Sequence, residues 1–256
     1  MTEKHSEPVR SIAKACTLLD ILTEAKRPLS LGELTQAAGW AKSTVYGLLT
    51  SMRGCGLIEQ DGVSGKFSLG VRLFEYGSAV SSTRNVISLA KAPMERLVKA
   101  TGESASLSML DRGEALVLLH AEADSGFHIV SETGAHLPSF ATAQGKALLS
   151  GQSDAAVRRI FEAKAQPFTP HTVADADTLL TELRTVRETG YAIENGEFKI
   201  GIRGAASPIR DHTGAIRYAI GLVGMFRRVD SDEFRAATAE VRKAAAAISE
   251  ALGYRM

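Results

Sequence analysis

The feature that most constrains the fold is a pair of short helical patterns, residues 31–38 and 42–52, separated by a few residues around Gly39. Ser30, followed three residues later by Glu33, forms the pattern of a capping box and predicts a helix that starts directly after Ser30. Gly39 can adopt the left-handed conformation on which such a helix ends. Two helices joined by so short a turn predict a helix-turn-helix.

The flanking segments predict a further helix and a hairpin. Residues 9–26 have one apolar stripe, typical of an amphipathic helix, and Pro28 stops the pattern. The stripe comprises Ile12, Ala15, Cys16, Leu19 and Leu22. Residues 57–69 contain two strand-like runs around a loop rich in Gly, Asp and Ser, which is the pattern of a hairpin. Together these elements predict a winged helix-turn-helix domain over residues 8–70.

The second helix of the pair carries most of the residues that we expect to contact DNA. From Trp40 to Gly56 the chain has two cations and no acid, so this surface does not repel phosphate. Hydroxyl side chains near the start of a recognition helix suit contacts to phosphates and base edges. A glycine inside the helix permits a close approach by DNA or by another helix. The candidates are Lys42, Ser43, Thr44, Tyr46, Gly47 and Arg53 in this helix and Lys66 in the hairpin. The alternative is a three-helix packing unit whose polar side chains are merely solvated.

The remainder of the chain predicts a linker helix over residues 71–84 and a second domain over residues 85–254. We expect Asn85 to cap the first helix of that domain and Gly102 to end it. The following strand-like runs are ASLSML, ALVLLHAE, FHIVSE, AASPIR and IRYAIGLVGM. Helical patterns lie near residues 144–150, 154–163 and 175–189, and a last helix runs from Asp232 to Leu252. One mixed or antiparallel sheet with flanking helices predicts the α+β class.

Composition argues against several other classes of protein. Hydrophobic residues make up 45% of the 256 residues and charged residues 23%, as in a soluble globular protein. The N-terminus has no apolar core of a signal peptide, and the longest apolar stretch, AIGLVGMF, is far shorter than the roughly 20 residues of a membrane-spanning helix. Cys16 and Cys55 fall on the apolar side of their helical patterns, which predicts buried free thiols. We therefore expect a cytoplasmic protein with no membrane contact.

The sequence has no strong motif of a metal site or an enzyme. His120, His128 and His136 recur every eight residues, but zinc needs three or four converging ligands and no cysteine or carboxylate cluster accompanies these histidines. S-x-x-K occurs at residues 11–14 and 88–91 without the partner motifs of serine acyl-enzymes. We expect no catalytic residue, no metal and no cofactor.

These segments resemble the IclR family of bacterial transcription regulators. SIAKACTLLDIL, PLSLGELTQAAGWAKSTVYGLLTSM and GLIEQDGVSGKFSLGVRLFEYGS are similar to the winged-helix domain of that family. ATAQGKALL, RETGYAIENGEFKIGIRGAASPIRD and the closing helix are similar to its GAF-like effector-binding domain. The resemblance covers about residues 8–253. It implies a DNA-binding transcription regulator that acts as a homodimer or homotetramer on a palindromic operator in double-stranded DNA.

The second domain has a candidate site for a small-molecule effector. Thr142 to Gly145 form a small-residue turn at a helix start, where N–H groups and the helix dipole favour an anion such as a carboxylate. The resemblance implies that the effector lies between this helix start and the strands that carry GIRGAASPI and AIGLVG. The candidate ligand-binding residues are Thr142, Ala143, Gln144, Gly145, Glu194, Ile202, Gly204, Gly221 and Val223.

The resemblance also bears on the chemistry of the ligand. Members that bind very small oxoacids use hydroxyl or thiol groups at several positions where this chain has Gly204, Gly221 and Val223. A wider and more apolar cavity, with Glu194 as the acceptor for a ligand hydroxyl or N–H, predicts an aromatic effector such as a hydroxybenzoate-like acid or a derivative. The alternative is that the glycines only ease the packing of strands.

Two other functions stay open at the level of sequence. The chain could be a small-molecule enzyme with a winged-helix appendage, although Glu194 would be a lone acid–base candidate. It could also be a partner-docking module in which the winged helix contacts another protein.

Overall fold

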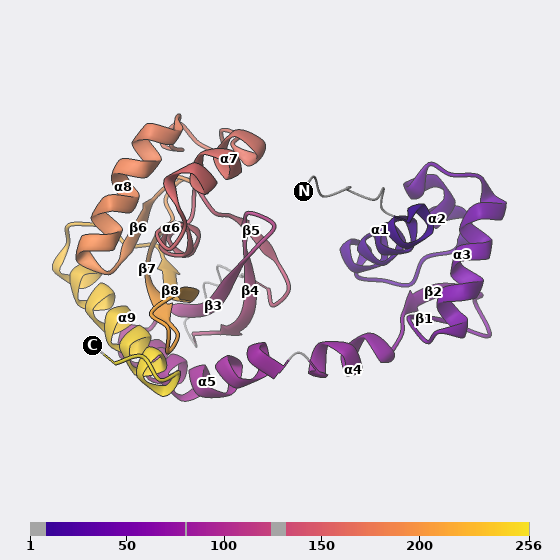
Figure 1. Ribbon diagram of the computed structural model, residues 1–256, viewed down its shortest axis with the longest axis horizontal. Coiled ribbons are helices and arrows are strands. Elements are labelled where there is room, and N and C mark those ends of the chain that lie inside the picture. Colours follow the sequence, from indigo (N-terminus) through magenta and orange to yellow (C-terminus); the bar gives the residue numbers. More distant parts are fainter. Residues whose placement is uncertain (1–8, 80, 124–131, 256) are drawn as a thin grey trace, which may run out of the picture. The chain divides into compact units, whose positions relative to one another are not determined.

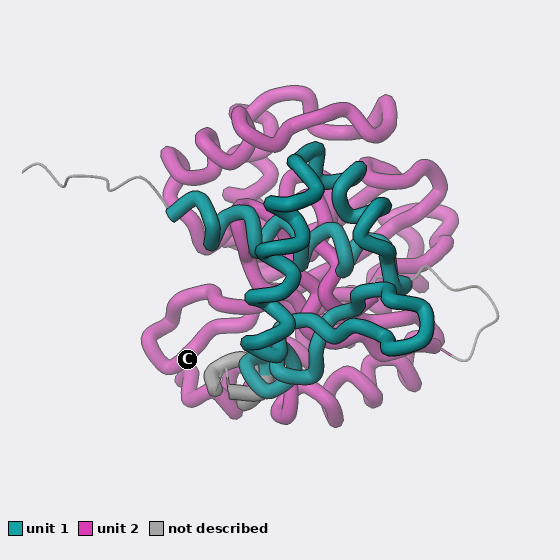
Figure 2. The backbone as a smooth tube through the Cα atoms, turned by 90° about the vertical axis from the view of Figure 1, so that its right-hand side faces the viewer, with its two compact units in different colours: residues 1–81 teal, residues 82–256 magenta. Residues whose placement is uncertain are grey.

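The computed structural model describes residues 9–79, 81–123 and 132–255. The chain divides into two compact units, residues 1–81 and 82–256 (Figure 2). The division therefore falls within the segment 71–84, where the sequence predicts a linker helix.

The first unit contains three helices, a two-stranded sheet and a fourth helix (Figure 1). The order is α1 (Arg10–Ala25), α2 (Leu31–Ala38), α3 (Lys42–Gly54), β1 (Ile58–Gln60), β2 (Phe67–Leu69) and α4 (Arg72–Ala79). The strands β1 and β2 pair antiparallel and form the wing of the domain. The predicted winged helix-turn-helix is confirmed.

Local hydrogen bonds explain where α2 begins and ends. The Ser30 hydroxyl accepts a hydrogen bond from the backbone N–H of Glu33 at 3.3 Å, and the Glu33 carboxylate accepts one from the backbone N–H of Ser30 at 2.8 Å. Gly39 ends the helix with a φ of 67°, which a residue with a side chain rarely adopts. The turn around Gly39 then leads directly to α3, whose Val45, Leu49 and Met52 are buried in the core.

Two expectations about the first unit are wrong. Ile12 is 63% exposed and Cys16 is exposed, because the face of α1 that packs on the core is centred on Leu18 and Leu22. Cys55, at the C-terminal end of α3, is exposed as well. Both thiols are free, but neither is buried.

The second unit is built on a six-stranded sheet with the order β5-β4-β3-β8-β7-β6, and every neighbouring pair in it is antiparallel. The strands are β3 (Ser104–Asp111), β4 (Glu114–Ala121), β5 (His136–Pro138), β6 (Ala192–Asn195), β7 (Arg203–Arg210) and β8 (Ile216–Gly224). The helices are α5 (Ser81–Thr101), α6 (Ala143–Leu149), α7 (Asp154–Lys164), α8 (Ala176–Thr189) and α9 (Asp232–Ala251). The predicted α+β class is confirmed.

The sheet of the second unit is covered on both faces, as Figure 1 shows. Successive side chains of a strand point to opposite faces. Ala205 of β7 accordingly packs in the cluster formed with α5 and α9, whereas its neighbour Ala206 packs in the cluster formed with α6. The helices α7 and α8 pack together around Phe140 and Leu183 in a further cluster. The two faces of the sheet therefore belong to two separate clusters of the core.

Three details of the second unit differ from expectation or lie outside the description. Asn85 lies inside α5, which begins at Ser81, so it does not cap that helix. The short strands β5 and β6 were not predicted, because a run of three or four residues carries too little periodicity. The run FHIVSE lies outside the described residues except for Glu132, which is not in a strand.

The described part of the chain contains no helix that is both long enough and apolar enough to span a bilayer.

Candidate functional site

The helix α3 presents the predicted DNA-contacting residues at the surface of the first unit. Lys42, Ser43, Tyr46 and Gly47 are exposed, and Thr44 is half-buried. The residue before the helix is Ala41, which provides no side-chain cap. The first N–H groups of a helix have no partners within the helix, so an uncapped start can donate to a phosphate.

Gly47 has no packing role within the first unit. A Cβ atom placed on this residue would meet no atom within 4 Å. The sequence offers two reasons for a glycine here, close approach by another helix or by DNA. The open space around Gly47 excludes another helix of the same unit, and close approach by a molecule from outside this unit remains.

The wing is tied to the C-terminal end of α3 by side-chain hydrogen bonds. The Arg53 guanidinium donates to the Gln60 side-chain oxygen at 2.5 Å, and the Gln60 amide donates to the carbonyl of Gly65 at 3.0 Å. Lys66 is exposed beside this link, and Val63 at the tip of the wing is 99% exposed. Arg53 thus fixes the wing relative to α3, a role that sequence reasoning did not assign to it.

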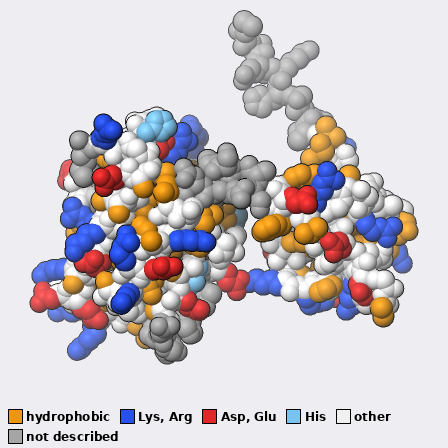
Figure 3. Space-filling model, turned by 90° about the horizontal axis from the view of Figure 1, so that it is seen from below, with side chains coloured by type: hydrophobic (Ala, Val, Ile, Leu, Met, Phe, Trp, Pro, Cys, Tyr) orange, Lys and Arg blue, Asp and Glu red, His pale blue; other side chains and the backbone are white. Residues whose placement is uncertain are grey.

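The net charge of the chain neither supports nor opposes DNA binding. The chain has 30 Lys and Arg against 29 Asp and Glu. On the face shown in Figure 3, basic and acidic side chains are interspersed over both units. The hypothesis therefore depends on the local surface of α3 and the wing.

A cavity of about 190 Å³ in the second unit lies between the start of α6 and the strands β6, β7 and β8. The structure brings together at this cavity most of the residues predicted to bind a ligand. These are Thr142, Ala143, Gln144, Glu194, Ile202, Gly204 and Val223. Sequence reasoning missed the other residues that line the cavity, namely Leu137, Phe198, Lys199 and Leu222.

Two predicted residues, Gly145 and Gly221, do not line the cavity and serve close packing instead. A Cβ atom on Gly145 would lie 2.2 Å from the Cα atom of Ser139, so α6 can approach this segment only with a glycine there. A Cβ atom on Gly221 would lie 2.8 Å from that of Ala206 and 3.1 Å from Cγ of Gln144. For these two glycines the packing explanation holds.

Glu194 is the buried ionisable group among the residues that line the cavity, and only 5% of it is exposed. Burial raises its pKa to about 7, against the opposing effect of the hydrogen bond from the backbone N–H of Phe198, which is 3.2 Å from the carboxylate. The backbone N–H of Ala143 at the start of α6 also hydrogen-bonds the Glu194 carboxylate. The Thr142 hydroxyl accepts from the N–H of Gly145 at 3.2 Å. Of the N–H groups expected to hold a ligand carboxylate, those of Ala143 and Gly145 thus have partners within the protein.

Lys146 is a buried cation that sequence reasoning missed. Its side chain is 2% exposed, and its ammonium donates to the carboxylate of Glu197 at 2.5 and 2.6 Å and lies 2.6 Å from that of Glu182. Burial raises the pKa of Glu197, and the adjacent Lys146 acts in the opposite direction. Two carboxylates around one ammonium satisfy the charge of Lys146 inside the unit.

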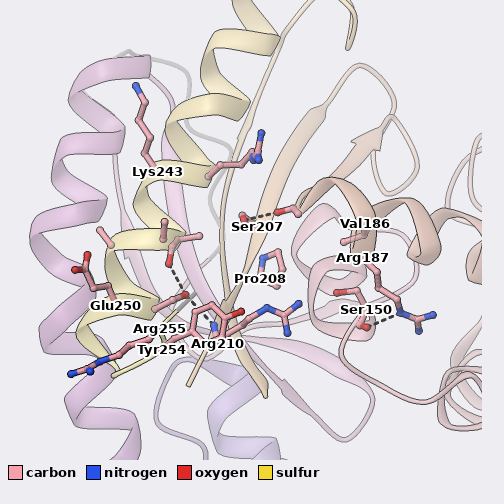
Figure 4. Close-up of a pocket in the computed structure, with 16 residues that line it drawn as sticks. Ser150, Val186, Arg187, Ser207, Pro208, Arg210, Lys243, Glu250, Tyr254 and Arg255 are labelled. Atoms are coloured by element: carbon pink, nitrogen blue, oxygen red, sulfur yellow. Dashed lines mark hydrogen bonds between the residues drawn. The ribbon is translucent and has the colours of Figure 1, made fainter. Parts of the chain in front are cut away.

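A second and larger groove of about 740 Å³ lies between α9, β7 and the C-terminal end of α8 (Figure 4). Several of its polar groups already have hydrogen-bond partners within the protein. Figure 4 shows Arg187 directed at Ser150, whose carbonyl accepts from the guanidinium at 2.9 Å, while Ser207 donates to the carbonyl of Gly190 at 2.7 Å. None of the predicted ligand-binding residues lines it. The smaller cavity at Glu194 is therefore the better candidate for a ligand site.

Among residues 9–79, 81–123 and 132–255, no group of three or more His, Cys, Asp and Glu side chains could hold a metal ion. His136 lies 3.0 Å from the Asp111 carboxylate and forms a pair with it. His128 lies outside the described residues.

Comparisons with known proteins match both units. The domain described as "Bacterial transcriptional regulator IclR C-terminal" matches residues 78–250, and "IclR helix-turn-helix domain" matches residues 11–62. The chain is 31% identical over 247 residues to the HTH-type transcriptional regulator XynR of Escherichia coli strain K12, covering 96% of this chain and 98% of the relative. It is 29% identical over 255 residues to the HTH-type transcriptional repressor AllR of the same strain, covering 97% and 94%.

A solved structure has the same fold. It is an IclR homolog from Microbacterium hydrocarbonoxydans complexed with 4-hydroxybenzoate, with a TM-score of 0.84 and 23% identity, covering 94% of this chain and 98% of that one.

The raised pKa of Glu194 predicts a pH-dependent stability. The folded protein binds this proton more tightly than the unfolded chain, so the contribution is complete below pH 4.5 and is lost as the pH rises through about 7. Glu194→Gln should therefore gain free energy of unfolding relative to the wild type over this range, by at most about 3 kcal/mol. Urea unfolding at pH 5 and pH 8 measures the gain, and the exposed Glu162→Gln variant is the control. An equal effect of Glu194→Gln at both pH values would show that the carboxyl group is not perturbed.

Proposed function

The chain belongs to the IclR family of bacterial transcriptional regulators, and we propose that it binds an operator through α3 and the wing under the control of a hydroxylated aromatic acid bound at Glu194. Transcription regulators of this type bind DNA through the helix-turn-helix and respond to an effector. The operator contacts, the class of effector and the oligomeric state are the parts that we propose.

The surface of α3 supports the proposed DNA contacts. Lys42, Ser43 and Tyr46 project from the exposed face of the helix, and the uncapped start of α3 adds backbone N–H groups. A recognition helix inserts its N-terminal residues into the major groove. Lys66 on the wing is exposed, which supports a contact to the phosphate backbone, and the hydrogen bond of Arg53 to Gln60 supports a role in holding the wing.

The size and lining of the cavity support a small ligand with one ring. A volume of about 190 Å³ is below the roughly 300–1,000 Å³ of sites for drug-sized molecules. Leu137, Phe198, Ile202, Leu222 and Val223 provide an apolar lining. A flat apolar body fits such a lining, whereas a very small oxoacid would leave much of it uncovered.

The charges at the cavity support one orientation of the ligand. Glu194 is buried and burial raises its pKa to about 7; in its ionised form it repels a ligand carboxylate and accepts a hydrogen bond from a hydroxyl. Lys199 is exposed and lines the same cavity, with its ammonium 5.6 Å from the centre of the Phe198 ring. We place the hydroxyl of the ligand at Glu194 and its carboxylate toward Lys199. This revises the expectation that the start of α6 holds the carboxylate.

Exposed apolar side chains on α1 and α4 support a homodimer or homotetramer. Ile12 on α1 is 63% exposed, and Phe74 and Tyr76 on α4 are 75% and 51% exposed. Figure 3 shows hydrophobic side chains open to solvent on the smaller unit. One helix-turn-helix reads too few base pairs for a specific site, and two copies read the two halves of a palindromic operator.

An enzymatic function has little support. The relatives are named transcriptional regulators and repressors. Catalysis would also require a second acid–base group or a nucleophile beside Glu194, and the lining residues with the chemistry for this are Thr142 and Lys199. The Thr142 hydroxyl is engaged with the carbonyl of Pro138 at 2.8 Å and with the N–H of Gly145.

The placement of the recognition helix can be tested on DNA. Lys42→Ala and Thr44→Ala should each weaken binding to a duplex selected in vitro, by roughly tenfold for a lost phosphate contact, because such contacts carry much of the affinity. The affinity for the effector should not change. Fluorescence anisotropy at several salt concentrations gives both affinity and salt dependence. Lys164→Ala in the second unit is the control. Wild-type affinity in both variants would contradict the placement.

The effector class can be tested by isothermal titration. We expect 4-hydroxybenzoate to bind at least tenfold more tightly than benzoate, because a hydrogen bond to a buried ionisable acceptor contributes about 1.5–3 kcal/mol. Glu194→Ala should remove this difference while benzoate affinity stays unchanged. Preference for pyruvate or glyoxylate over both aromatic acids would reject the proposal.

The oligomeric state can be tested by light scattering after size exclusion. We expect a mass of at least twice the 27.3 kDa of one chain, and a smaller assembly or weaker operator binding for Phe74→Asp. Val63→Asp changes an even more exposed apolar residue at the wing tip and should keep the wild-type mass. A wild-type mass of 27.3 kDa at micromolar concentration would contradict an oligomer.

A further inference from the structure

The two carboxylates that neutralise Lys146, those of Glu182 and Glu197, differ in burial and in the segment to which they belong. Glu182 lies on α8, its side chain is 40% exposed, and it does not line the effector cavity. Glu197 is buried and lies in the connection between β6 and β7. Lys146 and both carboxylates line a separate cavity of about 310 Å³, so none of the three contacts a ligand at Glu194.

The connection that contains Glu197 forms one wall of the effector cavity. Residues 194–202 supply Glu194, Phe198, Lys199 and Ile202 to the lining. Within this segment the Glu194 carboxylate accepts from the N–H of Phe198 at 3.2 Å, and the N–H of Gly196 donates to the carbonyl of Ile202 at 2.8 Å. The wall is therefore a short looped segment that folds back on itself.

Glu197 anchors this wall from two sides. Its side chain is held by the ammonium of Lys146. Its backbone carbonyl accepts from the hydroxyls of Thr172 at 2.7 Å and Thr169 at 3.2 Å. The Glu197 carboxylate also accepts from the N–H of Asn195 at 3.4 Å. The ion pair with Lys146 ties the segment to α6, and the start of α6 forms the opposite side of the cavity.

We propose that Lys146 is a positioning residue of the effector site: through Glu197 it holds residues 194–202 in the arrangement that places Glu194, Phe198 and Ile202 at the cavity. The assignment of this cavity to the effector rests on the proposed function. The positioning of the wall does not depend on the ligand, because every contact in the network is made by the protein alone.

A merely neutralising role and a positioning role make different predictions for the two carboxylates. If Lys146 only needed a counter-ion, removing the charge of either Glu182 or Glu197 would leave residues 194–202 in place, since each carboxylate lies within 2.6 Å of the ammonium. If Lys146 positions the wall, removing the charge of Glu197 releases residues 194–202, whereas removing that of Glu182 leaves them in place. Glu182→Gln is thus a matched control for Glu197→Gln.

Hydrogen–deuterium exchange of the full-length protein without ligand measures the wall directly. We expect peptides covering residues 194–202 to exchange at least about tenfold faster in Glu197→Gln and in Lys146→Met than in the wild type, because local opening sets the exchange rate. Glu182→Gln and Lys164→Met, which breaks an exposed pair with Glu114, should exchange like the wild type in this segment. If Lys146→Met fails to fold, the comparison of Glu197→Gln with Glu182→Gln still tests the positioning role.

Titration with 4-hydroxybenzoate gives the second readout. We expect a loss of affinity of about tenfold in Glu197→Gln and none in Glu182→Gln, because only the first disorders the wall. Equal exchange in the two glutamine variants overturns the positioning role, whatever the ligand does. Faster exchange in Glu197→Gln alone, with no binding of any aromatic acid by the wild type, upholds the positioning role and overturns the proposed effector instead.

Discussion

The effector-binding unit depends on the close packing of α6 against the sheet. All seven residues of this helix are buried, and Gly145 approaches the Ser139 backbone more closely than any side chain would allow. A helix without an exposed face cannot leave a charge or a first-turn N–H group to solvent. Lys146 is therefore enclosed by two carboxylates, and the Thr142 hydroxyl and the Glu194 carboxylate take N–H groups at the helix start. The chemistry of the cavity follows from this one constraint.

The close packing of α6 also determines the surroundings of Glu194. Burial and the nearby carboxylate of Glu197 raise the pKa of Glu194. In the proposed complex its ionised form would accept a hydrogen bond from the ligand and disfavour a second anion there. The glycines of the neighbouring strands have separate roles, since Gly204 lines the cavity and Gly221 permits the approach of Gln144.

Structural features that depend only on residues close together in the chain were predictable from the sequence. The capping box of Ser30 and Glu33, the turn at Gly39 and the hairpin of the wing each lie within a few residues of chain, and the structure has all three. The positions of Glu194 and Gly204 at one cavity came from family resemblance. Local pattern alone could not have placed them beside α6.

Features that depend on distant partners were missed. Lys146 sits in an apolar helical pattern, and its partners lie 36 and 51 residues away, so nothing nearby in the sequence indicates a buried ion pair. The predicted stripe on α1 shares Leu22 with the buried face, but it includes the exposed Cys16 and omits the buried Leu18. The sequence predicts Asn85 as a helix cap, but α5 begins at Ser81. Periodicity over one helix cannot fix these choices, because tertiary contacts decide them.

The central claim is that occupancy of the Glu194 cavity changes the affinity of the first unit for DNA. Thermodynamic linkage makes this reciprocal: whatever factor the ligand applies to operator binding, the operator applies to ligand binding. The direct test measures operator affinity against 4-hydroxybenzoate concentration and ligand affinity with and without saturating operator duplex. The account predicts the same factor in both directions, at least about fivefold, and its loss in Glu194→Ala. Operator affinity that stays constant while the cavity is saturated would contradict it.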